Sequence, residues 1–276
     1  MRKIAITGGK GGTGKSTVAT ALAHKLSENH KVLLLDLDVE CPNDSLILGI
    51  KTVKAQDVMS MLPKFDFSKC IKCGKCAQAC KANAIIQVTD KNPILVPEQC
   101  NGCKACMLVC PTGAISENKQ VIGTIHKGQN NIDLIYGALK PNIEESSLIV
   151  NAVKKFVSDF EKNYDYVIID TSAGTHCPVI SALMDVDLGI AVTEPTPLGA
   201  HDLRLILDLM KELGVDSKIV LNRSDITDSS EIKQISNEKN AEIIAEIPFS
   251  KKIAENYSKG KPLEHEAIDR IIEVIK

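Results

Sequence analysis

The chain has 276 residues, 44% of them hydrophobic, which allows one large domain or a medium domain with a smaller one. Its 33 basic and 35 acidic residues give a net charge of -2, a near-neutral balance that disfavours a nucleic-acid-binding protein. No apolar run reaches the ~18 residues of a membrane span, and no signal-peptide pattern precedes the first strand pattern. We therefore expect a cytoplasmic protein that binds neither nucleic acid nor membrane.

Short apolar segments alternate with amphipathic segments over most of the chain. Continuous apolar runs are typical of parallel strands buried on both faces. They predict strands at 3–7, 32–37, 121–125, 132–136, 166–170, 188–193, 218–221 and 242–247. Helical periodicity predicts helices at 15–27, 146–160, 200–213 and 264–275. This order predicts an α/β fold, a mostly parallel sheet covered by helices on both faces.

The character of the sequence changes between about residues 65 and 117, where cysteine, lysine, proline and glycine dominate and helical periodicity stops. An insertion between two halves of one α/β domain is the simplest account. We assign residues 1–62 and 118–276 to one discontinuous domain and residues 63–117 to a small α+β insert.

A glycine-rich loop joins the first predicted strand to the first predicted helix, as the pattern G-x-x-x-x-G-K-S/T requires. The loop consists of Gly9, Lys10, Gly11, Gly12, Thr13, Gly14, Lys15, Ser16 and Thr17. Backbone N–H groups and the helix N-terminus bind phosphate oxygens in such loops. We expect Lys15 to reach the β- and γ-phosphates and the Ser16 hydroxyl to ligate Mg²⁺. The alternative is a glycine-rich turn without a ligand, which the register of these elements disfavours.

The lysine at the second loop position, Lys10, resembles the deviant signature K-G-G-x-G-K-S/T of the MinD/ParA/Mrp and nitrogenase iron-protein group of P-loop ATPases. The resemblance implies a homodimer that forms with ATP. It also implies that Lys10 crosses the dimer interface to contact the partner's nucleotide.

Later segments resemble the same family. The strand ending in Asp36 and Asp38 resembles its switch I, which implies that Asp38 positions the attacking water and that Asp36 lies near Mg²⁺. The strand ending in Asp170 resembles Walker B. The implied catalytic residues are Lys10, Lys15, Asp38 and Asp170, and the implied Mg²⁺ ligands are Ser16, Asp38 and Asp170.

Two further segments resemble the family's adenine site. Asn222 and Arg223 resemble the strand end that reads adenine, and Pro248 lies in a segment that resembles the one flanking the base. The alternative for Asn222 is a turn residue after a strand.

Eight of the ten cysteines form two runs with C-x2-C-x2-C-x3-C spacing. In a reducing compartment such a pattern favours metal binding over disulfides. Each run resembles a bacterial ferredoxin, which implies two 4Fe–4S clusters, with the fourth cysteine of each run ligating the other cluster. One cluster is then assigned Cys70, Cys73, Cys76 and Cys110, and the other Cys100, Cys103, Cys106 and Cys80. The first run has Lys81 where the second has Pro111, and a pair of structural zinc sites is the alternative.

Two cysteines lie outside these runs. Cys177 follows Asp170 at the offset of the cluster cysteine of the nitrogenase iron protein. The second cysteine of that protein's pair is not evident here, and Cys41 is the residue that could lie near Cys177. A bridging cluster, a redox or partner contact, and a small apolar residue in switch II are all open readings of Cys177.

The resemblance is to MinD-superfamily ATPases with an inserted ferredoxin domain. It implies a Mg²⁺-dependent ATPase that couples nucleotide state to electron transfer toward an unidentified redox partner protein. An iron–sulfur cluster carrier of the Mrp type is the alternative, although no C-x-x-C follows Cys177. A spatial organiser like MinD or ParA is a third reading, which the acidic polar side of residues 264–276 disfavours.

Overall fold

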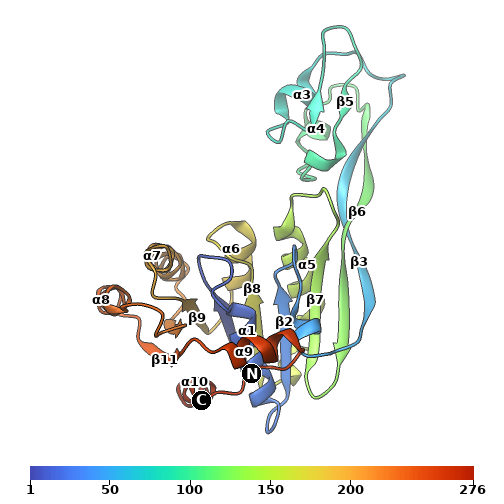
Figure 1. Cartoon of the computed structure of the whole chain (residues 1–276). Coiled ribbons are helices and arrows are strands. Elements are labelled where there is room, and N and C mark those ends of the chain that lie inside the picture. Colours follow the sequence, from blue (N-terminus) through green and yellow to red (C-terminus); the bar gives the residue numbers. More distant parts are fainter. The chain divides into compact units, whose positions relative to one another are not determined.

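The computed structural model describes the backbone of residues 1–276 and all side chains except those of Ala254, Tyr257 and Ser258. The chain forms two compact units, coloured along the sequence in Figure 1. Unit 1 comprises Met1–Ala55, Ile125–Ala138 and Ser147–Lys276. Unit 2 comprises Gln56–Thr124 and Leu139–Ser146, so it extends beyond the expected insert 63–117 at both ends.

The main sheet has the strand order β11-β10-β9-β1-β8-β2-β7-β6-β3. These strands are β1 (Arg2–Thr7), β2 (Val32–Leu37), β3 (Thr52–Phe65), β6 (Ile115–Gln129), β7 (Asp133–Leu139), β8 (Tyr166–Thr171), β9 (Leu188–Thr193), β10 (Ser217–Asn222) and β11 (Ile243–Ile247). From β11 to β7, each neighbouring pair of strands is parallel. Every residue of β2, β8 and β9 is buried, which explains their continuous apolar runs and confirms the predicted parallel sheet.

Helices cover both faces of this sheet. They are α1 (Lys15–Leu26), α2 (Asp44–Ile47), α5 (Ser146–Val157), α6 (Cys177–Leu183), α7 (Pro197–Glu212), α8 (Ser230–Lys239), α9 (Lys251–Ser258) and α10 (Glu266–Ile275), with a 3-10 turn at Glu161–Asn163. Alternate residues of one face, such as Ile4 and Ile190, pack in a core with α1 and α10. The opposite face carries Gly189, next to Met210 of α7, and Gly137, next to Ile149 of α5. Successive strand residues point to opposite faces of the sheet, so α1 and α10 cover one face and α5 and α7 cover the other.

The C-terminal helix α10 buries Ala267, Ile268, Ile271 and Ile275 in the core of unit 1, while its acidic residues Glu266, Asp269 and Glu273 face solvent. Across the part of the chain that the structure describes, we find no helix with the length and apolar content that a membrane span requires.

Unit 2 contains the cysteine runs together with parts of β3 and β6. Its short elements are α3 (Lys75–Ala79), β4 (Ile85–Ile86), β5 (Ile94–Leu95), a 3-10 turn at Pro97–Gln99 and α4 (Ala105–Leu108). The strand β3 was not predicted, and β6 is far longer than the predicted 121–125. Residues 53–57 of β3 are exposed, so the apolar signal that predicts a strand is missing there.

Candidate functional site

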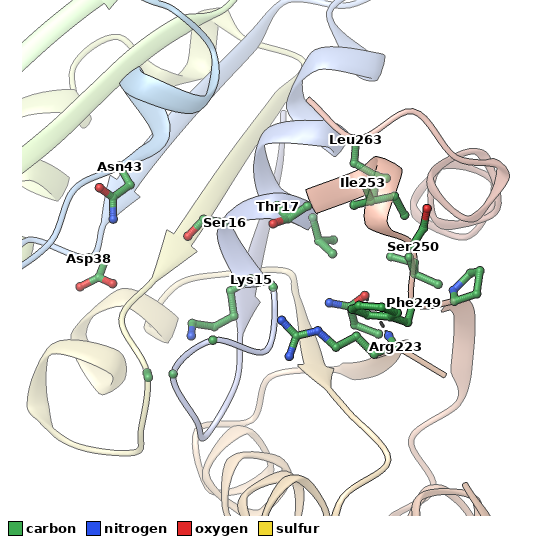
Figure 2. Close-up of a pocket in the computed structure, with 18 residues that line it drawn as sticks. Lys15, Ser16, Thr17, Asp38, Asn43, Arg223, Phe249, Ser250, Ile253 and Leu263 are labelled. Carbon is green, nitrogen blue, oxygen red and sulfur yellow. Dashed lines mark hydrogen bonds between the residues drawn. The ribbon is translucent and has the colours of Figure 1, made fainter. Parts of the chain in front are cut away.

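A cavity of about 440 Å³ in unit 1 lies at the carboxyl ends of the parallel strands. Its volume is within the usual range of about 300–1,000 Å³ for small-molecule sites. Among the predicted site residues it is lined by Gly11, Gly12, Gly14, Lys15, Ser16, Thr17, Asp38, Asn222, Arg223 and Pro248. Figure 2 shows Asp38 and Asn43 on one side of Lys15, with Arg223 and Phe249 on the other. The structure thus brings most of the predicted nucleotide residues to one cavity.

The loop after β1 is held by a residue from the other side of the cavity. The Asn222 side-chain amide donates a hydrogen bond of 2.8 Å to the Thr13 carbonyl. Gly14 has φ of 98°, and a Cβ atom there would lie 2.4 Å from the same amide nitrogen. Glycine is therefore required by both conformation and space. Sequence analysis predicted base recognition for Asn222 and missed this bond to the loop.

The Lys15 side chain is buried inside the loop, where its ammonium donates to the Lys10 carbonyl at 3.2 Å. Burial lowers the pKa of Lys15, and the nearby carboxylates of Asp170 and Asp38 partly oppose this. The ammonium therefore lies between the glycine loop and two acids, which suits a group that neutralises phosphate next to a metal ion.

Three buried carboxyl groups meet beside the loop, contributed by Asp36, Asp44 and Asp170. One oxygen of each lies within 4.8 Å of the others. Asp36 accepts backbone N–H groups of Asp38, Asn43 and Asp44 at 2.9–3.1 Å. In contrast, both oxygens of Asp44 and one of Asp170 are buried without a hydrogen-bond partner among the described residues. The sequence did not predict a role for Asp44. It belongs to the short helix α2, and only the folded chain brings that helix close to Asp36 and Asp170.

Burial raises the pKa of all three acids. The pKa values of Asp36 and Asp44 lie well above their ordinary range, and that of Asp170 rises to about 7. Repulsion from neighbouring carboxylates adds to the effect, while the Ser16 hydroxyl donates to Asp170 and opposes it. Asp38 lines the nucleotide cavity, and burial also raises its pKa. Buried acids that repel one another, three of whose oxygens lack a hydrogen-bond partner among the described residues, would be stabilised by a hard divalent cation, so this group fits Mg²⁺.

We predict that Mg²⁺ stabilises the protein more strongly as pH rises. Without metal, the folded protein keeps a proton on Asp170 that the unfolded chain has released, so the folded state binds more protons between about pH 4 and pH 7. Burial favours protonated Asp36 and Asp44 in the same direction. The trio therefore lowers the free energy of unfolding as pH rises through that window. A bound Mg²⁺ that replaces those protons should restore the lost free energy of unfolding.

The measurement is the Mg²⁺-dependent rise in Tm with ADP at about pH 5.5 and pH 8. Asp170→Asn, which cannot ionise, should lose the part of the pH dependence that Asp170 contributes. A Mg²⁺ effect of equal size at both pH values in the unaltered protein would contradict the assignment.

Lys10 contacts its own chain. Its ammonium lies 2.6 Å from one carboxylate oxygen of Glu194, and Arg223 donates to the other oxygen at 2.8 Å. The Glu194 side chain is only 7% exposed. Burial would raise the pKa of Glu194, but Lys10 and Arg223 together lower it, so it is held ionised. Glu194 follows β9 without any motif, so no signal in the sequence indicated its role.

Two small cavities in unit 2 are each lined by four of the cysteines. Cys70, Cys73, Cys76 and Cys110 line one cavity. Cys80, Cys100, Cys103 and Cys106 line the other. In each cavity, three cysteines come from one run and the fourth comes from the other run.

The two cysteine loops repeat the same backbone conformation. Lys72 and Gly74 flank Cys73 with φ of 57° and 75°, and Gly102 and Lys104 flank Cys103 with φ of 72° and 64°. A lysine at positive φ costs about 1–2 kcal/mol. Each loop therefore accepts this cost at one residue beside its central cysteine.

The distances between the thiols and their pKa values indicate which kind of metal group the cysteines could bind. Among the described residues, no three cysteine sulfurs lie mutually within 4.8 Å. A tetrahedral zinc ion with bonds of about 2.3 Å would hold its sulfurs about 3.8 Å apart. Burial raises the pKa of Cys76 and Cys100, and raises that of Cys106 to about 11. For Cys110 the same burial effect is outweighed by donors from Thr112, Ala114 and Gly113, which lower its pKa.

The two cysteines outside the runs lie at the surface. Cys177 begins α6, and both Cys177 and Cys41 are exposed. Lys104 pairs with Glu117 at 2.8 Å and Lys69 with Asp66 at 3.3 Å. Both ion pairs are exposed to solvent.

A family model described as the CobQ/CobB/MinD/ParA nucleotide binding domain matches residues 4–263. The chain therefore belongs to this nucleotide-binding family. A protein of Methanocaldococcus jannaschii, described as uncharacterised, is 37% identical over 263 residues, which are 95% of this chain and 91% of the relative. An iron-sulfur cluster carrier protein of Rickettsia bellii is 29% identical and matches 94% of this chain, although the match spans only 65% of that relative.

Solved structures resemble the fold. The septum site-determining protein MinD of Pyrococcus horikoshii, complexed with Mg-ADP, matches with a TM-score of 0.62 at 20% identity. The match covers 99% of this chain and 94% of that protein. At this identity the likeness shows the α/β P-loop fold alone.

Proposed function

We propose that this member of the CobQ/CobB/MinD/ParA family is a Mg²⁺-dependent ATPase that dimerises around ATP and couples its nucleotide state to electron transfer through two 4Fe–4S clusters. The observation that carries the proposal is the combination of sites in one chain. A phosphate loop beside unpaired buried acids occurs together with two cavities, each lined by four cysteines. We also propose that residues 63–117 form a ferredoxin-like insert.

The nucleotide chemistry would be phosphoryl transfer from ATP to water, which breaks the bond between the γ-phosphorus and the bridging oxygen. Lys15 would neutralise charge on the β- and γ-phosphates. Ser16 and Asp170, with Asp36 and Asp44 behind them, would hold Mg²⁺, while Asp38 would orient the attacking water. A second lysine, Lys10 of the partner subunit, would add positive charge only in the dimer, so hydrolysis would depend on dimerisation.

The eight cysteines of unit 2 would hold the clusters, which supply one-electron transfer when bound. The crossed lining of the two cavities suits the pairing seen in bacterial ferredoxins. The donors around Cys110 include the Ala114 N–H, 3.3 Å from the sulfur. Such donors stabilise negative charge on sulfur and would raise the potential of that cluster.

An iron–sulfur cluster carrier is the second candidate, favoured by the name of the Rickettsia bellii relative. A carrier must release its cluster to an acceptor protein, whereas an electron-transfer protein must retain it. Incubation of the loaded protein with an apo-ferredoxin distinguishes them. Transfer of iron accelerated by Mg-ATP would favour the carrier, and retention of both clusters would favour electron transfer.

We predict that nucleotide binding changes the cluster potentials. An anaerobic redox titration followed by EPR would compare the protein with and without a non-hydrolysable Mg-ATP analogue. For a one-electron couple, a shift of about 60 mV corresponds to a tenfold difference in nucleotide affinity between the two redox states.

The control for this titration is Lys15→Ala, which should keep its clusters and show no shift with the analogue. Identical curves for the unaltered protein in both conditions would contradict coupling through the potential. Absence of any 4Fe–4S signal after anaerobic reconstitution would contradict the redox function and favour zinc.

A further inference from the structure

Glu194 lies where three adjacent parallel strands end. It follows β9, which pairs with β1 on one side and β10 on the other. The loop after β1 carries Lys10, and β10 is followed by Arg223. Because the carboxyl ends of parallel strands meet at one edge of a sheet, the topology brings one acid and two cations together. Arg223 also lines the nucleotide cavity, so the group touches the proposed ATP site.

The pairing of one buried acid with two cations has an energetic consequence. Removing the only partner of a buried charge is strongly unfavourable, since the remaining charge is neither solvated nor neutralised. Here Arg223 keeps its contact with Glu194 if Lys10 leaves. The Lys10 side chain is 31% exposed, against 7% for Glu194, so the lysine is the member with access to solvent. Lys10 can therefore depart without leaving an unpaired buried anion.

We propose that Glu194 is a positioning residue that holds Lys10 against its own chain until the nucleotide-dependent dimer forms. In the dimer, Lys10 exchanges the Glu194 carboxylate for phosphate oxygens of the partner's ATP, and Arg223 alone neutralises Glu194. The inference rests on the proposed dimer and adds its regulation. It also explains how a lysine that must act across an interface is kept from binding the nucleotide of its own subunit.

The test is the protein concentration at which half of the chains are dimeric with a saturating non-hydrolysable Mg-ATP analogue, measured by sedimentation velocity. Glu194→Gln keeps the shape and a hydrogen bond but loses the charge. Without this charge, Lys10 is released more easily and the dimer should form at a lower concentration. The contribution of a charged hydrogen bond is large enough for the half-dimer concentration to fall about tenfold. Glu194→Asp retains the charge and should lie within about threefold of the unaltered protein.

The matched control is Glu161→Gln. Glu161 forms an ion pair with Lys3 that is also 2.6 Å long and similarly buried, with the Glu161 side chain 12% exposed, but it lies outside the nucleotide cavity. The Glu161→Gln variant should have the same half-dimer concentration as the unaltered protein. An equal fall in both variants would mean a general stability effect and would overturn the role of Glu194.

A second variant predicts the opposite sign. In Arg223→Gln, Lys10 is the main cation that remains next to Glu194. Moving Lys10 away from Glu194 then costs more free energy, so the half-dimer concentration should rise at saturating nucleotide. Unchanged dimerisation of Glu194→Gln, with normal dimerisation of the unaltered protein, overturns this inference and leaves the proposed function standing. If the unaltered protein binds the analogue but never dimerises, the proposed dimer and this inference both fall.

Discussion

Replacing Lys15 by alanine should reduce ATP turnover by at least about 100-fold, the scale on which removing one preorganised charge from a transition state acts. Lys15 is buried between the glycine loop and the acids, and its ammonium donates within the loop. Its loss would leave the phosphates and Mg²⁺ site without their nearest fixed cation. The measurement is phosphate release with Mg-ATP, together with the affinity for a fluorescent ATP analogue.

Lys25→Ala is the matched control for this prediction. Lys25 belongs to the same helix, α1, but it is exposed and pairs with Glu28 at 3.0 Å. Its removal should leave turnover within about twofold, because exposed ion pairs contribute little. Turnover of Lys15→Ala near that of Lys25→Ala would mean that the loop does not carry out the proposed chemistry.

The second large effect is expected for Cys106→Ser, which should lose about half of the bound iron. The buried core around the cysteines includes Cys76, Ile85, Cys106 and Ile115, so thiols form a large part of it. Small domains with little apolar core commonly need a metal for folding, and the proposed clusters would have that role in unit 2. We therefore expect unit 2 to lose protection from proteolysis as well as iron.

The pKa of Cys106 adds a condition to this experiment. Without iron, burial raises the pKa of its thiol to about 11, so cluster assembly must displace a proton. Reconstitution should therefore proceed further at about pH 8.5 than at about pH 7. Cys41→Ser, at an exposed cysteine outside both cavities, serves as the control and should retain all of its iron. Full iron content in Cys106→Ser would contradict the assigned ligand set.

Local patterns predicted the parts of the protein that depend on neighbouring residues. The loop from Gly9 to Thr17 needs glycines, a lysine and a hydroxyl at set spacings, and the helix α1 begins at Lys15 as that spacing requires. Buried parallel strands such as β8 and β9 were predicted because burial on both faces demands continuous apolar residues. The family match over residues 4–263 agrees with those predictions.

The failures share a cause, which is that exposed or isolated residues carry no local signal. Residues 53–57 of β3 face solvent, so no apolar alternation marked the strand. The three-residue link between the neighbouring strands β6 and β7 indicates an antiparallel hairpin, which agrees with a sheet predicted to be mostly parallel.

The sequence by itself determined the phosphate loop, the parallel core and the cysteine spacing, because each depends on residues close together in the chain. Only the tertiary structure decided that Asp44 joins Asp36 and Asp170, and that Glu194 holds Lys10 and Arg223. These groups come from the ends of different strands or from a short helix. Their charges interact only after the sheet has aligned those strand ends. The distances between these side chains cannot be predicted from a sequence pattern, because most of the residues are far apart in the chain.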